Sequence, residues 1–336
     1  MTLTQLPVIN IAPYLAGTPE GKAEVARQIN AACTEIGFFM ITGHRFSREL
    51  LNAAYETASQ FFNLPSAEKL KIKQPDPQIS RGYTPLGGES LAYGLGNEAP
   101  PDLKEMVDFG PVDVLPDDSD RDYFYGPQAG NFFYPNLFPK QPPQFKAVFE
   151  QYYRSMNQLA NALMQIFATA LELPEGYFVN KLDKNLSAVR IIRYPEQNSH
   201  PQPGQLRSGA HTDYGTLTIL YADQAAGGLQ VKHRQGYWVD VMPVEGCFTV
   251  NIGDAMQIWT NDRWISTLHR VVNPPAAIAS SSRRQSIVFF HQPNYDTVIE
   301  PLPCCIDDHH PQQYQPVTFG QHWMNKWMAT KVSEVA

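Results

Sequence analysis

The strongest pattern along the chain is a stripe of apolar residues at helical spacing between residues 145 and 171. Positions three or four apart share one face of a helix, so this stretch predicts a long amphipathic helix with one buried face. Two shorter helices are predicted nearer the N-terminus, one between the capping pair Thr18-Pro19 and Gly37, the other over residues 48–63. The stripe of the long helix consists of Phe145, Val148, Tyr152, Met156, Leu159, Leu163, Ile166 and Ala170.

After residue 185 the pattern changes to short apolar or alternating runs separated by turn residues. Eight such runs at this spacing favour a sandwich or jelly roll over a parallel α/β sheet. Asn261-Asp262-Arg263 predicts a hairpin turn between two of them, and two more strands are predicted at residues 7–11 and 38–41. The eight predicted strands cover residues 188–194, 215–221, 229–232, 238–241, 248–252, 256–260, 269–272 and 286–291.

Residues 75–143 show no clear period and are rich in Pro, Gly, Asp and Tyr. Structureless stretches of this length are usually functional loops, so we interpret the region as a wall of an active site. We expect four regions in the chain. They are residues 1–140 (an N-terminal region with lid loops), 141–184 (the long packing helix and a linker), 185–300 (a mainly β core) and 301–336 (a C-terminal tail that covers the pocket).

Composition narrows the functional classes. Hydrophobic residues make up 43% of the 336 positions, which is enough for a core, and the net charge of -7 argues against general binding to nucleic acid or anionic membranes. The four cysteines form no C-x-x-C pair, and no secretion signal or membrane-spanning run is recognisable. We therefore expect a cytoplasmic protein with reduced thiols.

His211-Thr212-Asp213 places an imidazole and a carboxylate two residues apart. In an extended segment, such residues point to the same side and can bind one metal ion. The motif alone is weak, because a histidine beside a turn aspartate is common. His269, at the start of another predicted strand, adds a third ligand. Two histidines and one carboxylate are the ligand set of non-haem Fe(II) oxygenases, with open positions for a 2-oxo acid and O2.

Arg284 and Ser286 follow the third candidate ligand and share one face of the next predicted strand. A guanidinium and a hydroxyl on that face can hold the distal carboxylate of a dicarboxylate. An isolated arginine would more often be a surface cation, but this position beside Ser286 favours an anion-binding role.

These residues resemble the isopenicillin N synthase-like branch of the Fe(II)/2-oxoglutarate-dependent dioxygenases. The resemblance extends over nearly the whole chain, and its motifs occur in the family's order. The segments that carry it are Leu6-Pro7-Val8-Ile9-Asn10, Gly37-Phe38-Phe39 with Gly43-His44, Asp102-Leu103-Lys104-Glu105 with Asp108-Phe109-Gly110, His211-Thr212-Asp213-Tyr214-Gly215, Gly227-Gly228-Leu229-Gln230-Val231, Trp238-Val239-Asp240-Val241, Asn251-Ile252-Gly253-Asp254 and Leu268-His269-Arg270-Val271.

The resemblance implies an α+β fold with a mainly β core, a distorted double-stranded β-helix flanked by the N-terminal and central helices. Two departures stand out. Ile192 occupies a position where many plant members have asparagine, and residues 273–283 form a longer loop than usual, so that a register shift would give the role of Arg284 to Arg283. We keep Arg284, because only it has a serine two positions on. By resemblance, the metal ligands are His211, Asp213 and His269, and the 2-oxoglutarate contacts are Arg284, Ser286 and Tyr194.

Substrate contacts are predicted from the irregular region and from positions beside the ligands. For each, an ordinary surface or core role remains the alternative. His291 is the histidine outside the metal group closest to the expected pocket, but it has the opposite strand parity to Arg284, so Phe290 is the more plausible inward residue. The candidates for substrate binding are Arg81, Tyr83, Glu89, Tyr214, Leu217 and Phe290.

The predicted activity is oxidation of an unactivated C–H bond of a small metabolite, by hydroxylation, desaturation or ring closure, with Fe(II), 2-oxoglutarate and O2 as cofactor and co-substrates. Succinate and CO2 are the co-products. The substrate is expected to be amino-acid-derived or a natural-product intermediate. Two alternatives remain at this point: a 2-oxoglutarate-independent iron oxidase of the same fold, of the oxidative cyclase type, and a zinc-binding hydrolytic or structural β-helix protein.

Overall fold

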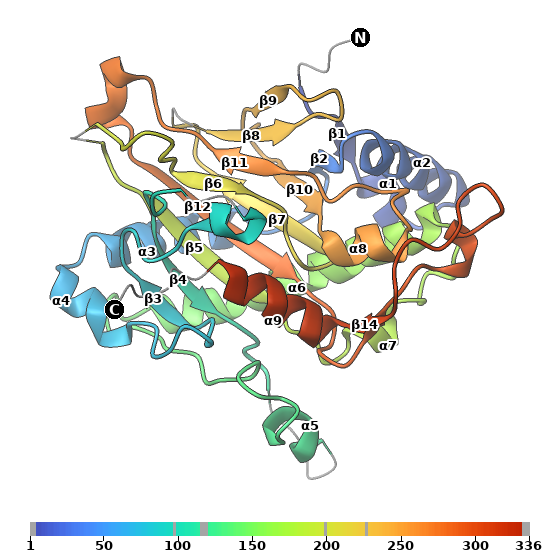
Figure 1. Ribbon diagram of the computed structural model, residues 1–336, viewed down its shortest axis with the longest axis horizontal. Coiled ribbons are helices and arrows are strands. Elements are labelled where there is room, and N and C mark those ends of the chain that lie inside the picture. The colour runs from blue at the N-terminus through green and yellow to red at the C-terminus, as the bar shows by residue number, and fades with distance from the viewer. Residues whose placement is uncertain (1–4, 97–98, 115–119, 198–199, 226–227, 331–336) are drawn as a thin grey trace.

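The computed structural model describes residues 5–96, 99–114, 120–197, 200–225 and 228–330, so Gly227 of the family resemblance lies outside the described residues. Two β-sheets form the centre of the molecule, and helices cover the outer face of the larger one (Figure 1). Side chains from both sheets line one internal cavity, which therefore lies between them. This is the β-helix arrangement expected from the sequence.

The larger sheet has eight strands, antiparallel except for the parallel pair β1–β2. Its order is β1 (Val8–Asn10), β2 (Phe38–Thr42), β10 (Phe248–Ile252), β7 (Leu217–Ala222), β12 (Arg284–His291), β5 (Ala188–Tyr194), β4 (Glu105–Phe109) and β3 (Gly82–Thr84). The smaller sheet has the order β6 (Ser208–His211), β11 (His269–Val271), β8 (Leu229–Lys232) and β9 (Trp238–Val241), and a separate pair joins β13 (Val298–Ile299) to β14 (Val317–Thr318).

Alternation along β5 and β12 gives the larger sheet two different faces. Odd-numbered residues such as Val189 and Phe289 pack into the main hydrophobic core with helix α6 (Phe145–Ala170). Even-numbered residues such as Tyr194 and Arg284 face the space between the sheets. Side chains in a strand point alternately to opposite faces, so each strand contributes to the core and to the cavity at the same time.

Helix α6 spans the outer face of the sheet together with α2 (Pro19–Glu35) and α3 (Arg48–Phe62) (Figure 1). The Thr18 side chain caps α2 by accepting a hydrogen bond from the Gly21 N–H at 3.1 Å, as its position before proline predicted. The shorter helices are α1 (Ala12–Leu15), α4 (Ser66–Lys69), α5 (Arg121–Tyr125), α7 (Val179–Leu182), α8 (Asp254–Trp259) and α9 (Phe319–Ala329), with 3-10 turns η1 (Leu70–Ile72), η2 (Leu91–Leu95), η3 (Ala276–Ser281) and η4 (Pro303–Cys305). Within the described ranges, no helix is long and apolar enough to cross a membrane.

Two local predictions were wrong. Residues 256–260 were expected to form a strand, but they belong mainly to helix α8, whose buried Ala255, Met256, Ile258 and Trp259 follow a helical period. Such a short apolar run does not distinguish a strand from a buried helical turn. Asn261 and Asp262 have positive φ angles of 50° and 65° and end this helix, so they do not form a hairpin turn.

Residues 75–143 are more ordered than their pattern suggested, because they contain β3, η2, β4 and α5. All five residues of β4 are buried, including Glu105 and Asp108. Glu105 binds Lys69 at 2.6 Å, and Asp108 lies opposite Arg190 in the strand register and binds it at 2.7 Å. Buried acids that pair with buried cations do not follow the usual pattern of apolar inward and polar outward residues. For this reason β4 was not predicted from the sequence.

Candidate metal centre and adjoining cavities

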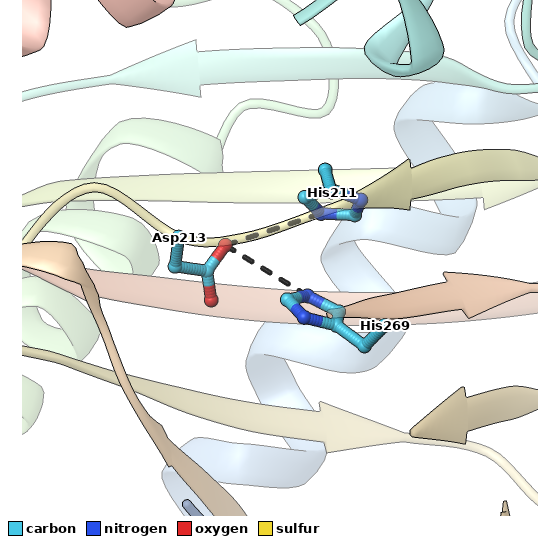
Figure 2. A group of neighbouring side chains, drawn as sticks. All are labelled: His211, Asp213 and His269. Atoms are coloured by element: carbon cyan, nitrogen blue, oxygen red, sulfur yellow. Dashed lines mark ion pairs between the residues drawn. The ribbon is translucent and has the colours of Figure 1, made fainter. Parts of the chain in front are cut away.

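Three side chains converge at one end of the smaller sheet. His211 is the last residue of β6 and His269 the first of β11, and the two are directly paired across the strands. Asp213 follows two residues after His211. Its Oδ1 atom lies 3.9 Å from His211 Nε2 and 3.8 Å from His269 Nε2, and Figure 2 shows the three groups pointing toward one another. His211 and Asp213 of the H-x-D motif therefore lie beside His269, as the sequence predicted.

Hydrogen bonds orient both imidazoles. His211 Nδ1 lies 2.8 Å from the Gly209 carbonyl oxygen, and His269 Nδ1 lies 3.0 Å from the Thr267 carbonyl oxygen. A carbonyl only accepts hydrogen bonds, so each Nδ1 carries the proton and each Nε2 keeps its lone pair for a metal ion. Burial, with His269 close by, lowers the pKa of His211 to about 3, which keeps that imidazole neutral.

The carboxylate of Asp213 is oriented in the same way. Its Oδ2 atom accepts hydrogen bonds from Thr218 Oγ1 at 2.6 Å and Asn251 Nδ2 at 2.7 Å, which leaves Oδ1 toward the imidazoles. Burial raises the pKa of Asp213, but the neighbouring His269 and His211, with the two hydrogen bonds, bring it below its ordinary value. Sequence reasoning missed the roles of Thr218 and Asn251, which depend on strand register.

This donor set fits Fe(II). Two imidazole nitrogens and one carboxylate oxygen, all within 4.8 Å of one another, form the facial set typical of non-haem iron oxygenases. No fourth histidine, cysteine, aspartate or glutamate joins the group in the described part of the chain, so three ligands hold one side and the other positions remain open.

A cavity adjoins this centre between the sheets and is lined by the predicted R-x-S pair. Arg284 is 3% exposed, while Arg283 is exposed, so the longer loop does not shift the register. Arg284 Nη1 and Ser286 Oγ are buried and make no hydrogen bond to any described residue. The third predicted contact, Tyr194, lines the same cavity with its ring 5.0 Å from the Arg284 guanidinium carbon.

Arg207 lies on the same tyrosine ring at 6.0 Å. Burial, together with the nearby Arg284, lowers the pKa of Arg207 to about 10. Arg284, whose unpartnered nitrogen lies in the cavity lining, is therefore suited to bind the distal carboxylate of a dicarboxylic acid, and Arg207 adds positive charge nearby.

A second cavity is also lined by His211 and Asp213. Four of the predicted substrate residues line it: Arg81, Glu89, Tyr214 and Phe290.

The other two predicted substrate residues do not reach this cavity. Tyr83 donates a hydrogen bond to Glu105 at 2.7 Å, and Leu217 is part of the main core. These two side chains therefore point elsewhere. His291 is fully buried, and its Nδ1 lies 2.8 Å from Thr216 Oγ1, which agrees with the parity argument.

Sequence reasoning also missed several residues that line the two cavities. Arg190 lines both, and it shares the even-numbered face of β5 with Tyr194, so strand parity could have identified it. Trp323 and Trp327, four residues apart on α9, and Gln292, directly after β12, line the second cavity. No sequence motif identifies Trp323, Trp327 or Gln292 as cavity residues; all three simply follow the core strands in the chain.

A buried network of charges contributes to the lining of both cavities. Lys104 Nζ lies 2.9 Å from Glu89 Oε2 and 2.9 Å from Asp102 Oδ2. Arg190 binds Asp108 at 2.7 and 3.1 Å and lies 3.4 Å from Glu89 Oε2. The acids Asp108 and Glu89 hold the pKa of Arg190 above its ordinary value although burial alone would lower it.

Comparison with known proteins agrees with this geometry. Residues 186–293 match the 2OG-Fe(II) oxygenase superfamily, and residues 6–141 match the N-terminal domain described as non-haem dioxygenase in morphine synthesis. The chain is 34% identical to the homoarginine-6-hydroxylase 2-ODD-C23 of Glycine max over 96% of each chain, and 32% identical to the 2-oxoglutarate-Fe(II) type oxidoreductase hxnY of Emericella nidulans, over 95% of this chain and 88% of that one.

Solved structures show the same fold. A full-length Neurospora crassa protein, crystallised in complex with alpha-KG and thymine, has a TM-score of 0.83 and 28% identity over 96% of each chain. The sequence matches cover the metal centre, the R-x-S strand and the N-terminal region together. The chain therefore belongs to the Fe(II)/2-oxoglutarate-dependent dioxygenases and uses Fe(II), 2-oxoglutarate and O2 to oxidise a small molecule.

Proposed function

We propose that His211, Asp213 and His269 hold Fe(II) through Nε2, Oδ1 and Nε2, and that Arg284 and Ser286 bind the C5 carboxylate of 2-oxoglutarate. The observation that carries this assignment is the position of two unpartnered polar groups, Arg284 Nη1 and Ser286 Oγ, in the cavity that also contains the three metal donors. A dicarboxylic 2-oxo acid then spans from the metal to this pair. Tyr194 adds a hydroxyl to the same end of the cavity.

Bound Fe(II) supplies the activation of O2, while the chain provides orientation and a dry cavity. In the balanced reaction, 2-oxoglutarate loses CO2 and gains one oxygen atom to become succinate. The second oxygen atom enters the substrate at a C–H bond. Since curated relatives are named hydroxylases, we propose hydroxylation as the primary outcome.

The substrate is a small molecule held in the second cavity, against the open side of the metal centre. Relatives and neighbours differ widely in what their names mention: homoarginine, thymine and auxin. The metal and co-substrate cavity thus accounts for the shared chemistry, and the lining of the second cavity determines the substrate. We also propose that residues 301–330 complete this lining, because Trp323 and Trp327 belong to it.

An anaerobic titration of the apoprotein with Fe(II) and then 2-oxoglutarate tests the assignment. We expect a weak visible charge-transfer band in the wild-type protein, no band in Asp213→Ala, and a band that needs much more 2-oxoglutarate in Arg284→Ala. Arg283→Ala, at the exposed neighbouring position, is the matched control and should behave as wild type.

A second readout follows succinate under O2. Bound iron without a charge-transfer band and without succinate would favour the 2-oxoglutarate-independent oxidase instead. A band that survives Asp213→Ala would contradict the ligand assignment.

A further inference from the structure

The second cavity combines an electrically balanced lining with aromatic walls. Apart from the metal group, its fully charged side chains are Arg81, Glu89, Asp108 and Arg190, whose charges sum to zero. Arg190 forms ion pairs with both Glu89 and Asp108, and Lys104 forms a further ion pair with Glu89. A charged substrate would have to break buried ion pairs, and the removal of one partner from such a pair costs several kcal/mol.

Among the described residues, Arg81 is the charged group of this lining without an acid in ion-pair contact; both terminal nitrogens have partners, while Nε is buried without one. Nη1 donates to the Ser80 carbonyl and Nη2 to the Phe132 carbonyl, both at 2.7 Å. Its guanidinium also lies against Gly110, where a Cβ would be only 2.0 Å from Nη2. Arg81 therefore joins the loop of Phe132 to the start of β3, and a carboxylate bound by two parallel hydrogen bonds would have to compete with one of these carbonyls.

Aromatic rings form much of the remaining surface. Trp323 and Trp327 are stacked at 5.2 Å with an interplanar angle of 17°, and Phe132 meets Trp323 edge-on at 5.8 Å. Phe290 and Tyr214 lie on the side of the metal centre. Flat rings of this kind favour a flat ligand, because stacked and edge-on contacts between rings maximise dispersion.

Two carboxamide side chains line this space, and Gln292 is the buried one, whereas Asn131 is exposed. Gln292 is 7% exposed and lines the cavity, and its backbone N–H binds Ser187 Oγ at 3.2 Å. Its side-chain amide has no hydrogen-bond partner in the part of the chain that the structure describes. Gly215 packs closely against this segment, since a Cβ there would lie 2.3 Å from the His291 carbonyl oxygen and 3.0 Å from Gln292 Cγ. A carboxamide offers one donor and one acceptor side by side, the complement of an amide in a ring.

We propose that the substrate is an uncharged flat ring that contains an amide, of the lactam or ureide class, stacked among the aromatic rings and held by two hydrogen bonds with the Gln292 side chain. This inference rests on the proposed function, because it places the ring beside the iron. It makes Gln292 a specificity-determining residue and leaves the charged network intact when the substrate binds.

Calorimetric binding to the anaerobic Fe(II)/2-oxoglutarate enzyme tests the proposal with four probes. Thymine and uracil-5-carboxylate share a ureide ring and differ in charge, 4-methylbenzoate has a ring and a carboxylate but no amide, and homoarginine carries a cation. We expect thymine to bind at least roughly tenfold more tightly than the other three.

Variants locate the contact. Gln292→Leu should weaken thymine binding roughly tenfold, as expected for lost hydrogen bonds, and should leave 2-oxoglutarate affinity unchanged. Gln292→Glu keeps the size of the side chain and should also weaken thymine binding. Gln285→Leu is the matched control and should not, because Gln285 is a buried glutamine of β12, the strand that Gln292 directly follows, and its amide donates to the Tyr55 carbonyl instead.

Tighter binding of a carboxylate or of homoarginine, or a loss of binding in Arg81→Met but not in Gln292→Leu, would overturn the proposal. So would failure of every ureide probe in enzyme that retains its charge-transfer band. Absence of the band itself would instead refute the proposed function, so the two failures are distinguishable.

Discussion

Replacement of Arg284 by glutamine should change which 2-oxo acid the enzyme prefers. The guanidinium is 3% exposed and has an unpartnered Nη1 beside the unpartnered Ser286 Oγ. With a bound dicarboxylate, these groups form charge-assisted hydrogen bonds inside a buried cavity. Glutamine keeps a polar donor at the position but removes the charge.

The magnitude follows from the number of contacts. A hydrogen bond to a charged group contributes roughly 1.5–3 kcal/mol, and a guanidinium makes two to a carboxylate. Part of this gain remains in the variant, because the glutamine side chain can still donate one neutral hydrogen bond. We therefore expect a net loss of about 3 kcal/mol, which corresponds to roughly a hundredfold weaker binding of 2-oxoglutarate.

The assay compares 2-oxoglutarate with 2-oxobutanoate, which lacks the distal carboxylate. Wild-type enzyme should prefer 2-oxoglutarate strongly by Kd and by decarboxylation rate. Arg284→Gln should lose most of this preference while its affinity for 2-oxobutanoate stays within a few-fold of wild type. Arg283→Gln, one residue earlier and exposed, is the control. A preference lost in Arg283→Gln and kept in Arg284→Gln would refute the register and the carboxylate assignment together.

Two further predictions concern the supports of the site. Burial lowers the pKa of His291 to about 3. As the pH falls below 6.5, this histidine therefore takes up a proton in the unfolded chain before it does so in the folded protein. The stability that neutral His291 contributes above pH 6.5 is consequently lost between pH 6.5 and pH 3. The destabilisation caused by His291→Leu should therefore shrink by about 2 kcal/mol between pH 7 and pH 5 in urea unfolding, and an unchanged difference would contradict it. Lys326 forms an ion pair with Asp254 at 2.9 Å and is partly exposed. Lys326→Gln should therefore weaken the packing of α9 by about 1 kcal/mol. The expected results are roughly fivefold faster amide exchange in that helix and a raised KM. Unchanged exchange in α9 would show that the ion pair does not hold the helix.

Prediction from the sequence succeeded best where apolar spacing alone determines structure. The stripe over residues 145–171 located α6 to within one residue, and strand parity placed Arg284 and Phe290 on the face of β12 that lines the cavities. The same reasoning fails where partners come from distant strands. Thr218 and Asn251 bind Asp213 only because β7 and β10 are neighbours in the sheet, and no local pattern contains that register.

One failure of the hydrophobic pattern, over residues 75–143, falls on residues that line the second cavity. Glu89 and Asp108 belong to a region without a clear period, and both are almost fully buried because Lys104 and Arg190 neutralise them. Burial of paired charges contributes little net stability compared with apolar residues of similar size, so a packing role alone does not account for them. Their contacts with Arg190 do account for them, because they hold by ion pairs a side chain that lines both cavities. Polar groups that must be held rigidly in an active site interrupt the regular hydrophobic pattern of the sequence at that point. Residues 75–143, which lack such a pattern, are therefore where substrate recognition is expected.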